Sequence, residues 1–416
     1  MSQQHNSAIV IVGGGSAGIS VAMSLLKRQG DLDITIIDPA SDHYYQPGFT
    51  LVGGGVFNVA QTRRDMKSVM PNKVQWLQEA VASFDPENNS LTLDSGDTVS
   101  YQRLIVCPGL KLDWDAVEGL RDTLGKNGVT SNYLPEYAPY TWQLVQKLES
   151  GKALFTQPPM PIKCAGAPQK ALYLSGDYWR DHQVLNNVDI AFYNAGGVLF
   201  GVANYVPALQ KYIDRYNVDL QLNHNLVKVD GPAQKAWFAR KDADGNTETV
   251  EAEFDMLHVC PPQTAPDFIK ASPLADEAGW VDVDPNTLQH KKYANVWGLG
   301  DATNSPNAKT AAAVRKQAPV VACNVLEDIR SSQARYGYDG YGACPLTVER
   351  GKIVLAEFRY GGKLSPTLPT WLLEGTRPTW LAWFLKKVVM PKLYWDGMLK
   401  GHETLVAPKK LDDLES

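Results

Sequence analysis

The strongest constraint on the fold of this chain is a glycine-rich turn near its start, between a buried strand and a helix. Residues 8–12 have the sequence AIVIV, an apolar run typical of a buried parallel strand, and GGGSAG follows at residues 13–18. A helical stretch at residues 19–29 and a second strand at residues 33–38, ending in Asp38, complete one βαβ unit. Because strands, helix and acid all accompany the G-x-G-x-x-G pattern, the segment predicts a dinucleotide-binding fold.

Each glycine of this turn has its own predicted task. Gly13 permits the tight turn, Gly15 lets the backbone approach a pyrophosphate, and Gly18 lets the helix pack closely on the strand. The free N–H groups at the start of the helix favour phosphates, and the acid that ends the unit accepts hydrogen bonds from a ribose hydroxyl. A glycine turn that binds nothing is the alternative, and the complete unit argues against it. The predicted cofactor-binding residues are Gly13, Gly15, Ser16, Ala17, Gly18 and Asp38.

Length and composition predict an enzyme of more than one domain. The chain has 416 residues, enough for about two or three domains of ordinary size. A formal net charge of -5 leaves no basic surplus to neutralise phosphates, so a nucleic acid is not expected as a partner. Five cysteines are too few for a disulfide scaffold, so a special cysteine is expected to be catalytic. No signal or transit peptide, no transmembrane helix and no metal site are expected.

A hairpin, a buried strand and a Cys-Pro pair occur together twice in the chain. The first hairpin, at residues 90–99, leads into LIVCPG at residues 104–109. The second, with its turn at residues 242–245, leads into MLHVCP at residues 256–261. This repetition predicts two related α/β halves. Gly109, directly after the first of these strands, joins the predicted cofactor-binding residues.

The second half lacks the expected phosphate-binding turn. Its opening strand, at residues 152–156, is followed by QPPMPIKCAGAP at residues 157–168 instead of a glycine fingerprint, so a second nucleotide is not expected. Cys164 lies there just before the start of a helix, between Lys163 and Lys170. Positive charge and the helix dipole favour the thiolate, which is the reactive form of a cysteine. A small residue in a tight turn is the alternative interpretation.

A third block completes the predicted cofactor site. Residues 295–301, NVWGLGD, form an apolar strand that ends in Gly-Asp, and a helical pattern follows at residues 309–317. An Asp at a strand end bonds a ribityl hydroxyl, and a helix N-terminus favours negative charge on a reduced flavin. The arrangement resembles the flavoprotein disulfide reductase family, which has two dinucleotide-binding domains, and this implies FAD as the cofactor rather than NAD. The predicted cofactor-binding residues of the block are Gly300, Asp301, Lys309 and Thr310.

The five cysteines fall into two groups. Cys107 and Cys260 occupy matching positions in the apolar strands of the repeat, and Cys323 lies in a helical pattern, so buried and inert thiols are expected there. Cys344 lies in the turn-rich sequence DGYGACP, which predicts an exposed loop. Cys164 and Cys344 are therefore the two cysteines predicted to lie outside regular apolar elements.

Several segments, in order through nearly the whole chain, carry a more specific resemblance: residues 162–170, 278–284, 287–290, 309–314, 338–341, 344–346, 353–358 and 393–395. On these segments the chain is similar to the sulfide:quinone oxidoreductases of the mitochondrial type. The resemblance implies a flavoenzyme that oxidises hydrogen sulfide and reduces quinone, with Cys164 and Cys344 as a redox pair bridged by a disulfide or a trisulfide. It also implies a small acceptor for the sulfane sulfur, which is sulfite, glutathione, cyanide or sulfide.

The segment from Trp371 to Trp395 combines aromatic, apolar and basic residues. Pro378 and Pro391 divide it into pieces too short to span a bilayer. This composition predicts an interfacial, monotopic helix pair, and so a peripheral membrane protein. A helix that covers the core, or a dimer contact within a homo-oligomer, is the alternative. Because the targeting extension of the mitochondrial proteins is missing, the bacterial inner membrane is the expected location.

The predicted fold class is α/β, with two Rossmann-like dinucleotide-binding domains, the second of them degenerate, and a C-terminal membrane-associating region. The FAD-binding domain is expected to be discontinuous, because the third block returns the chain to it, and comprises residues 1–112 and 256–330. The second Rossmann-like domain comprises residues 113–255 and carries Cys164. The C-terminal region, residues 331–416, carries the second redox cysteine and the membrane-binding helices.

Two rival functions use the same fold predictions. A quinone-reducing NADH dehydrogenase needs a glycine-rich second fingerprint, and the sequence KCAG at residues 163–166 is not one. A non-catalytic flavoprotein, with its cysteines as a redox sensor, is the other rival, and the complete set of flavin motifs argues against it. For the quinone pocket, the sequence analysis selects Phe358 and Tyr394.

Overall fold

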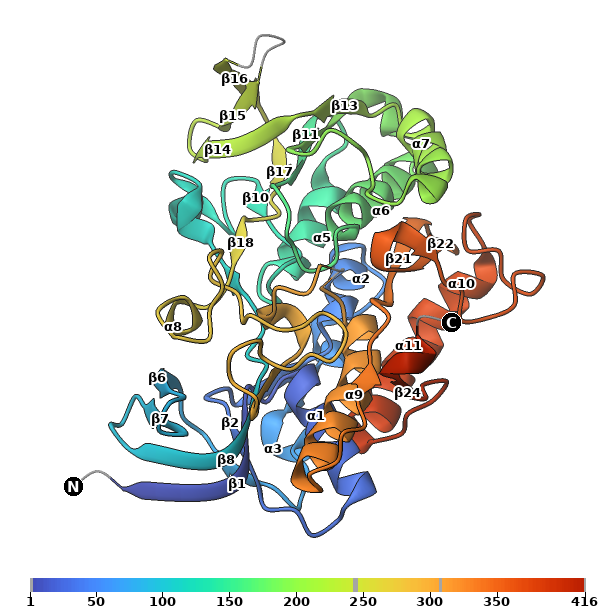
Figure 1. Cartoon of the computed structure of the whole chain (residues 1–416). Helices are drawn as coiled ribbons and strands as arrows, with labels where there is room; N and C mark the ends of the chain where they lie inside the picture. Colours follow the sequence, from blue (N-terminus) through green and yellow to red (C-terminus); the bar gives the residue numbers. More distant parts are fainter. Residues whose placement is uncertain (1–2, 242–245, 307–308, 415–416) are drawn as a thin grey trace.

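The structure is a computed structural model that describes residues 3–241, 246–306 and 309–414. Two sheets lie at opposite ends of the molecule, the first mixed, with an antiparallel edge, and the second parallel, and the C-terminal region runs along one side between them (Figure 1). The molecule has the mixed α/β architecture that the sequence predicts. The hairpin turn predicted at residues 242–245 lies outside the described residues.

The first sheet is built around the strand that precedes the glycine turn. Residues Ile9 to Val12 of this strand are buried, because parallel strands pair on both of its edges and helices cover the sheet. Helices α1 (Ser16–Arg28) and α9 (Ala311–Ile329) pack against each other here. The strands, in spatial order, are β5 (Gln75–Leu77), β2 (Ile34–Ile37), β1 (Gln4–Val12), β8 (Thr98–Val106), β7 (Ser90–Leu93) and β6 (Val81–Asp85), with β19 (Val296–Gly298) also paired to β8.

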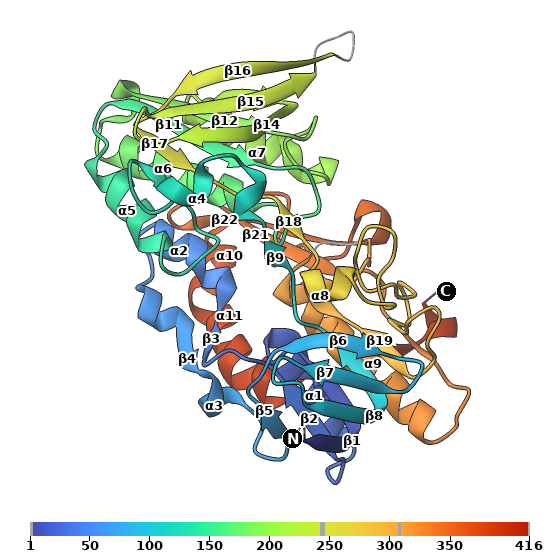
Figure 2. The same ribbon diagram turned by 90° about the vertical axis from the view of Figure 1, so that its left-hand side faces the viewer.

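The second sheet has five parallel strands with a different cover on each face. One face packs against helices α5 (Ala138–Lys147), α6 (Ala167–Asp181) and α7 (Val206–Arg215), and an antiparallel layer lies over the other (Figure 2). That layer consists of β14 (His224–Asp230), β15 (Lys235–Lys241) and β16 (Thr247–Glu253). The strands of the sheet, in spatial order, are β10 (Val129–Thr130), β17 (Met256–His258), β11 (Gly151–Gln157), β12 (Val188–Asn194) and β13 (Asp219–Leu222).

Strand β17 differs from the boundary expected from the sequence. Residues 256–258 were assigned to the FAD-binding domain, yet they pair with β10 and β11 in the second sheet. The chain passes between the two sheets through a short antiparallel ribbon, β9 (Lys111–Leu112) with β18 (Gln263–Thr264). The buried strand that follows the second hairpin therefore completes its own half, as the repeat itself implies, and the return to the first sheet comes after β18.

The C-terminal region begins with an antiparallel hairpin and ends with a helical run. The hairpin consists of β21 (Gly342–Glu349) and β22 (Lys352–Arg359), extended by β23 (Lys363–Leu364), and β21 packs against α6 (Figure 1). The short elements elsewhere are β3 (Asp42–Tyr44), α2 (Phe49–Gly53), β4 (Arg63–Asp65), α3 (Met66–Val69), α4 (Leu120–Thr123), α8 (Asp267–Lys270), β20 (Tyr336–Gly337) and β24 (Lys409–Lys410).

The C-terminal helical run is continuous, whereas the sequence predicts a pair of helices. It comprises α10 (Trp380–Phe384), a π-helical stretch (Leu385–Val389), α11 (Met390–Lys392), a second π-helical stretch (Leu393–Gly397) and a 3-10 turn (Met398–Lys400). Pro391 cannot donate a backbone hydrogen bond, and the wider turn before it accommodates its ring without a break. Among the described residues, the structure has no helix that is both long and apolar enough to cross a membrane.

Candidate functional site

The glycine turn has the shape that a pyrophosphate requires. A Cβ on Gly13, whose φ is 104°, would lie 2.5 Å from the Cys107 carbonyl oxygen, and one on Gly18 would lie 1.8 Å from the Gly13 carbonyl oxygen. A Cβ on Gly15 would meet nothing within 4 Å, so this side of the turn is open. Gly15 caps α1 without any side-chain hydrogen bond, which leaves the first N–H groups of the helix available to an anion.

The other residues predicted around this turn lie close to it. The Gly14 N–H donates a 2.6 Å hydrogen bond to Asp38 Oδ2, so the acid is held beside the turn. Ala17 is buried, and its Cβ would lie 3.3 Å from a Cβ on Gly300, so the first and third sequence blocks meet. Gly109 has a φ of 80° and open space around its Cα. The turn, the acid and the third block therefore surround one site that fits FAD.

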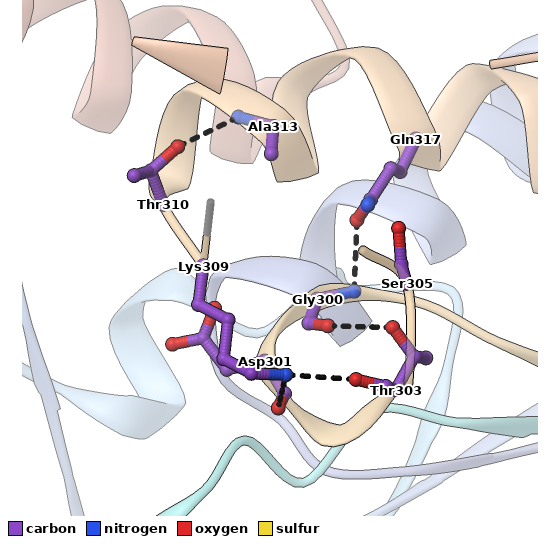
Figure 3. Close-up of a pocket in the computed structure, with 8 residues that line it drawn as sticks. All are labelled: Gly300, Asp301, Thr303, Ser305, Lys309, Thr310, Ala313 and Gln317. Atoms are coloured by element: carbon purple, nitrogen blue, oxygen red, sulfur yellow. Dashed lines mark hydrogen bonds between the residues drawn. The ribbon is translucent and has the colours of Figure 1, made fainter. Parts of the chain in front are cut away.

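The third block forms a pocket lined by Gly300, Asp301, Thr303, Ser305, Lys309, Thr310, Ala313 and Gln317 (Figure 3). The Lys309 ammonium donates to the backbone oxygens of Asp301 at 2.8 Å and Thr303 at 2.7 Å, and it lies 4.0 Å from the centre of the Trp280 ring. Burial lowers the pKa of Lys309 to about 8 and raises the pKa of Asp301. Lys309 therefore shapes the loop that carries Asp301.

The same pocket contains two hydrogen bonds that fix the start of α9. Thr310 is the N-cap of this helix, and its hydroxyl accepts from the Ala313 N–H at 3.2 Å. The Gly300 N–H donates to Gln317 Oε1 at 2.8 Å, and both bonds are drawn in Figure 3. The helix N-terminus is thereby aimed at the pocket. Thr310 serves this geometry as a cap.

The two candidate redox cysteines come together although 180 residues separate them in the sequence. Their Sγ atoms lie 3.3 Å apart, and both are free thiols in the structure. Cys164 precedes α6, whereas Cys344 lies in β21, which packs against this helix. A Cβ on Gly166 would lie 2.7 Å from Cys344 Sγ, so the close approach of strand and helix depends on a glycine there.

Cys164 is held in a strained backbone conformation. Its φ is 54°, in the left-handed region that residues other than glycine rarely adopt. Its N–H donates to the Lys309 carbonyl oxygen at 2.9 Å, and its own carbonyl accepts from Ala167 at 2.7 Å. The first of these bonds ties the cysteine to the third block. Cys164 and the candidate FAD pocket thus belong to one site.

The electrostatics of the pair favour a thiolate on Cys164. The hydrogen bond from Cys344 and the Lys170 ammonium, 3.0 Å from Cys164 Sγ, hold the pKa of Cys164 well below its usual range. The same interaction raises the pKa of Cys344, which keeps its proton. Lys163, which the sequence analysis placed beside the thiolate as well, instead donates to Gln46 Oε1 at 2.7 Å. The stabilising cation is therefore Lys170.

Cys344 does not lie in the exposed loop that its sequence context predicts. It is only 2% exposed, within β21, and its cross-strand partner in β22 is Ala356. The glycines before it are compatible with an edge strand as well as with a turn, and packing of the hairpin on α6 decides the outcome. The pairing partner of Cys164 is thus presented by a rigid element.

The remaining three cysteines differ from this pair in the pKa of their thiols. Cys107 and Cys260 are buried, as predicted, and burial raises the pKa of each thiol. Cys323, which was also expected to be buried, is only half-buried in α9, and desolvation raises its pKa against the opposing effect of Arg28. Raised pKa values keep these three cysteines in the less reactive thiol form.

Lys386 is a residue near the site that the sequence analysis did not single out, because it counts there as one of several basic residues facing a membrane. Its side chain is 2% exposed, and its ammonium donates to the Pro47 carbonyl oxygen at 2.8 Å. Burial, followed by the charge of Lys170, lowers the pKa of Lys386 to about 7. The sequence alone does not show whether the side chain of a single basic residue in an apolar helix points inward or outward.

The two residues selected for the quinone pocket lie in different hydrophobic clusters. Phe358 packs edge-on against Phe200, in the cluster that contains Cys344. Tyr394 belongs to the cluster of the first sheet, where its hydroxyl lies 2.6 Å from His43 Nε2. The structure therefore does not bring the two side chains together in one pocket.

Comparisons with known proteins identify the family of this chain. A family model described as pyridine nucleotide-disulphide oxidoreductase matches residues 7–157. The mitochondrial sulfide:quinone oxidoreductase of Dictyostelium discoideum is 42% identical to this chain over 415 residues, which cover 98% of this chain and 90% of that protein. The chain belongs to the sulfide:quinone oxidoreductase family. The mitochondrial member from Mus musculus is 40% identical over 399 residues, covering 96% of this chain and 88% of that protein.

A solved structure supports the fold independently. The sulfide:quinone oxidoreductase from Aquifex aeolicus aligns with a TM-score of 0.80 and 20% identity, covering 100% of this chain and 99% of that chain. FAD is accordingly the cofactor, and the turn and pocket described above fit it. The bacterial inner membrane expected from the sequence finds no support, because the two relatives described above are mitochondrial proteins.

Proposed function

We propose that Cys164 and Cys344 form the redox pair with which this protein oxidises hydrogen sulfide and reduces quinone. Sulfide:quinone oxidoreductase activity follows from its family. The proposal for the two residues rests above all on the 3.3 Å separation of their sulfur atoms beside the Lys170 ammonium. The bond from Cys164 to the Lys309 loop adds the link to the cofactor pocket.

The proposed reaction begins with the two cysteines joined in a disulfide. Hydrosulfide attacks Cys344 Sγ, the disulfide bond breaks, a persulfide forms on Cys344, and Cys164 leaves as the thiolate. Thiol–disulfide exchange is fastest when the leaving thiolate is stabilised, which Lys170 does here. A nucleophilic acceptor, such as sulfite, glutathione, cyanide or sulfide, then takes the outer sulfur from Cys344 and leaves a second thiolate.

Restoring the disulfide releases two electrons. FAD held by the turn from Gly13 to Gly18, by Asp38 and by the pocket around Asp301 would supply the two-electron chemistry between this pair of thiols and quinone. The protein side of the step is geometric, since the strained backbone of Cys164 and the buried strand position of Cys344 keep the two sulfur atoms adjacent for bond formation. A quinone-reducing NADH dehydrogenase is not favoured, because the segment where a nicotinamide nucleotide would bind carries Cys164 instead of a glycine fingerprint.

We further propose that the protein binds a membrane surface peripherally through its C-terminal region, where it meets quinone. Trp371 is 84% exposed and Trp380 is 65% exposed, which is unusual for tryptophan and is typical of a membrane interface. An open groove of about 460 Å³ runs along the helical run, and its apolar lining includes Phe384, Val388 and Leu393. The exposed apolar residues of this membrane-facing surface are Leu364, Trp371, Leu372, Trp380, Phe384, Val388 and Leu393.

Anaerobic reduction of the bound flavin tests the proposed function. Sulfide is expected to bleach the flavin absorbance of the wild-type protein within seconds, whereas NADH has little effect. Cys164→Ser and Cys344→Ser are each expected to abolish bleaching by sulfide with FAD still bound. Cys107→Ser and Cys260→Ser are the matched controls and retain the reaction, at a stability cost of about 1–2 kcal/mol for a buried hydroxyl. Wild-type turnover by Cys344→Ser would refute the redox pair.

A further inference from the structure

The inner face of the C-terminal helical run contacts the segment that follows β2 in the first sheet. Tyr394 is 5% exposed, and its hydroxyl lies 2.6 Å from Nε2 of His43 in β3. Its ring packs on Tyr45, with 4.9 Å between the ring centres, and Trp395 packs edge-on against His43. Arg64 covers the outer side of the Trp395 ring at 4.9 Å. The tyrosine is thereby held in one position.

This position brings Tyr394 to the pyrophosphate turn. Burial raises the pKa of Tyr394, and a hydrogen-bonding interaction with the side chain of Ser16, the first residue of α1, opposes this rise. His43 in turn interacts with the backbone of Gly14, and burial lowers the pKa of His43 to about 4, so its ring is neutral at pH 7. Tyr394 itself and its partner His43 therefore reach the two ends of the short segment from Gly14 to Ser16, which contains the open side of Gly15.

The same helical run is fixed to the first part of the chain at two further points. Lys386 donates to the Pro47 carbonyl oxygen at 2.8 Å. Beyond the end of the run, Glu403 accepts from Arg28 at 2.6 Å and from Ser24 at 2.6 Å, both on α1. The helix whose turn binds the cofactor is thus held at its C-terminal end by Glu403 and at its N-terminal end by Tyr394. The outer face of the run carries the membrane-facing surface.

We propose that Tyr394, together with His43, is a positioning residue for the FAD pyrophosphate turn, so that the C-terminal helical run retains the cofactor as well as facing the membrane. In this role Tyr394 acts through Ser16 and, by way of His43, through the backbone of Gly14. The inference depends on FAD as the cofactor and is independent of the redox pair, since cofactor retention is measured without sulfide.

The test is the rate of FAD release from the holoenzyme, followed by the rise in flavin fluorescence upon dilution. Tyr394→Phe keeps the ring and removes one buried hydrogen-bonding group, so FAD is expected to leave about three- to ten-fold faster, as loss of one hydrogen bond implies. Tyr101→Phe is the matched control. Tyr101 is buried in the same core, its hydroxyl has no hydrogen-bond partner among the described residues, and its variant is expected to release FAD at the wild-type rate.

A double variant separates positioning from packing. If Tyr394 acts through Ser16, the Ser16→Ala variant and the Ser16→Ala/Tyr394→Phe double variant release FAD at similar rates, because the second change removes a contact that is already lost. Multiplying effects in the double variant would overturn the route through Ser16. Release from Tyr394→Phe at the wild-type rate would overturn the proposal as a whole. Circular dichroism of each holoenzyme checks that the fold is retained.

Discussion

The approach of β21 to α6 makes Gly166 a decisive position for the reaction. Its backbone, with a φ of -94° and a ψ of 3°, accommodates any residue, so the effect of Gly166→Ala is purely steric. The added Cβ would lie 2.1 Å from Leu346 Cδ2 and 2.7 Å from Cys344 Sγ. The leucine methyl lies at the end of a flexible side chain and rotates away. The sulfur must move about 0.7–1 Å to reach an ordinary contact distance.

That movement increases the distance between the sulfur atoms from the present 3.3 Å to about 4 Å. A disulfide bond is only about 2 Å long, so bond formation then needs a larger rearrangement of the site. A misplacement of this size is expected to lower sulfide turnover about 100-fold. Denatured, air-oxidised Gly166→Ala is also expected to have two more thiols that react with a thiol reagent than the wild type has. Gly201→Ala is the matched control, because a Cβ there meets nothing within 4 Å. Wild-type turnover and thiol content in Gly166→Ala would refute the steric argument.

Two further changes test the electrostatics and the membrane surface. Lys170→Met removes the cation that, with the Cys344 hydrogen bond, lowers the pKa of Cys164, so this pKa is expected to rise. Alkylation of the reduced protein should then slow most at neutral pH and recover at alkaline pH. An unchanged pH profile of alkylation would contradict this prediction. The double variant Trp371→Ser/Trp380→Ser should bind liposomes more weakly than the wild type. Val198→Ser is the control, because it alters an exposed apolar residue elsewhere and should leave binding unchanged. Equal binding by the wild type and both variants would exclude the proposed membrane surface.

The parts of the site that the sequence predicted are those that local chain geometry determines. Gly13, Gly15 and Gly18 act within one turn, and the pattern of strand, turn, helix and acid specifies their surroundings without reference to distant residues. Thr310, which the sequence predicts only as a cofactor-binding residue, lines the third-block pocket and also caps α9. These residues lie where the fingerprint requires them, because the turn has no room for a Cβ at Gly13 or Gly18.

The residues that the sequence misjudged are those whose surroundings come from distant segments. Cys344 follows two glycines and a tyrosine, a composition that suits a turn, but pairing with β22 and packing on α6 make it part of a buried strand. The sequence also does not identify which lysine lies beside the Cys164 thiolate. Both Lys163 and Lys170 flank Cys164 in the sequence, and only the direction of the helix start decides which ammonium reaches the sulfur.

The C-terminal helical run has two faces that its composition does not distinguish. Composition identified a segment suited to an interface, yet composition does not state which of its polar groups face inward. Lys386 and Tyr394 point to the first part of the chain, whereas Phe384 and Val388 remain exposed on the outer face. Removal of the whole segment would therefore disturb two properties at once, cofactor retention and membrane binding. Single substitutions on opposite faces of one helix are needed to assign each property to its own residues.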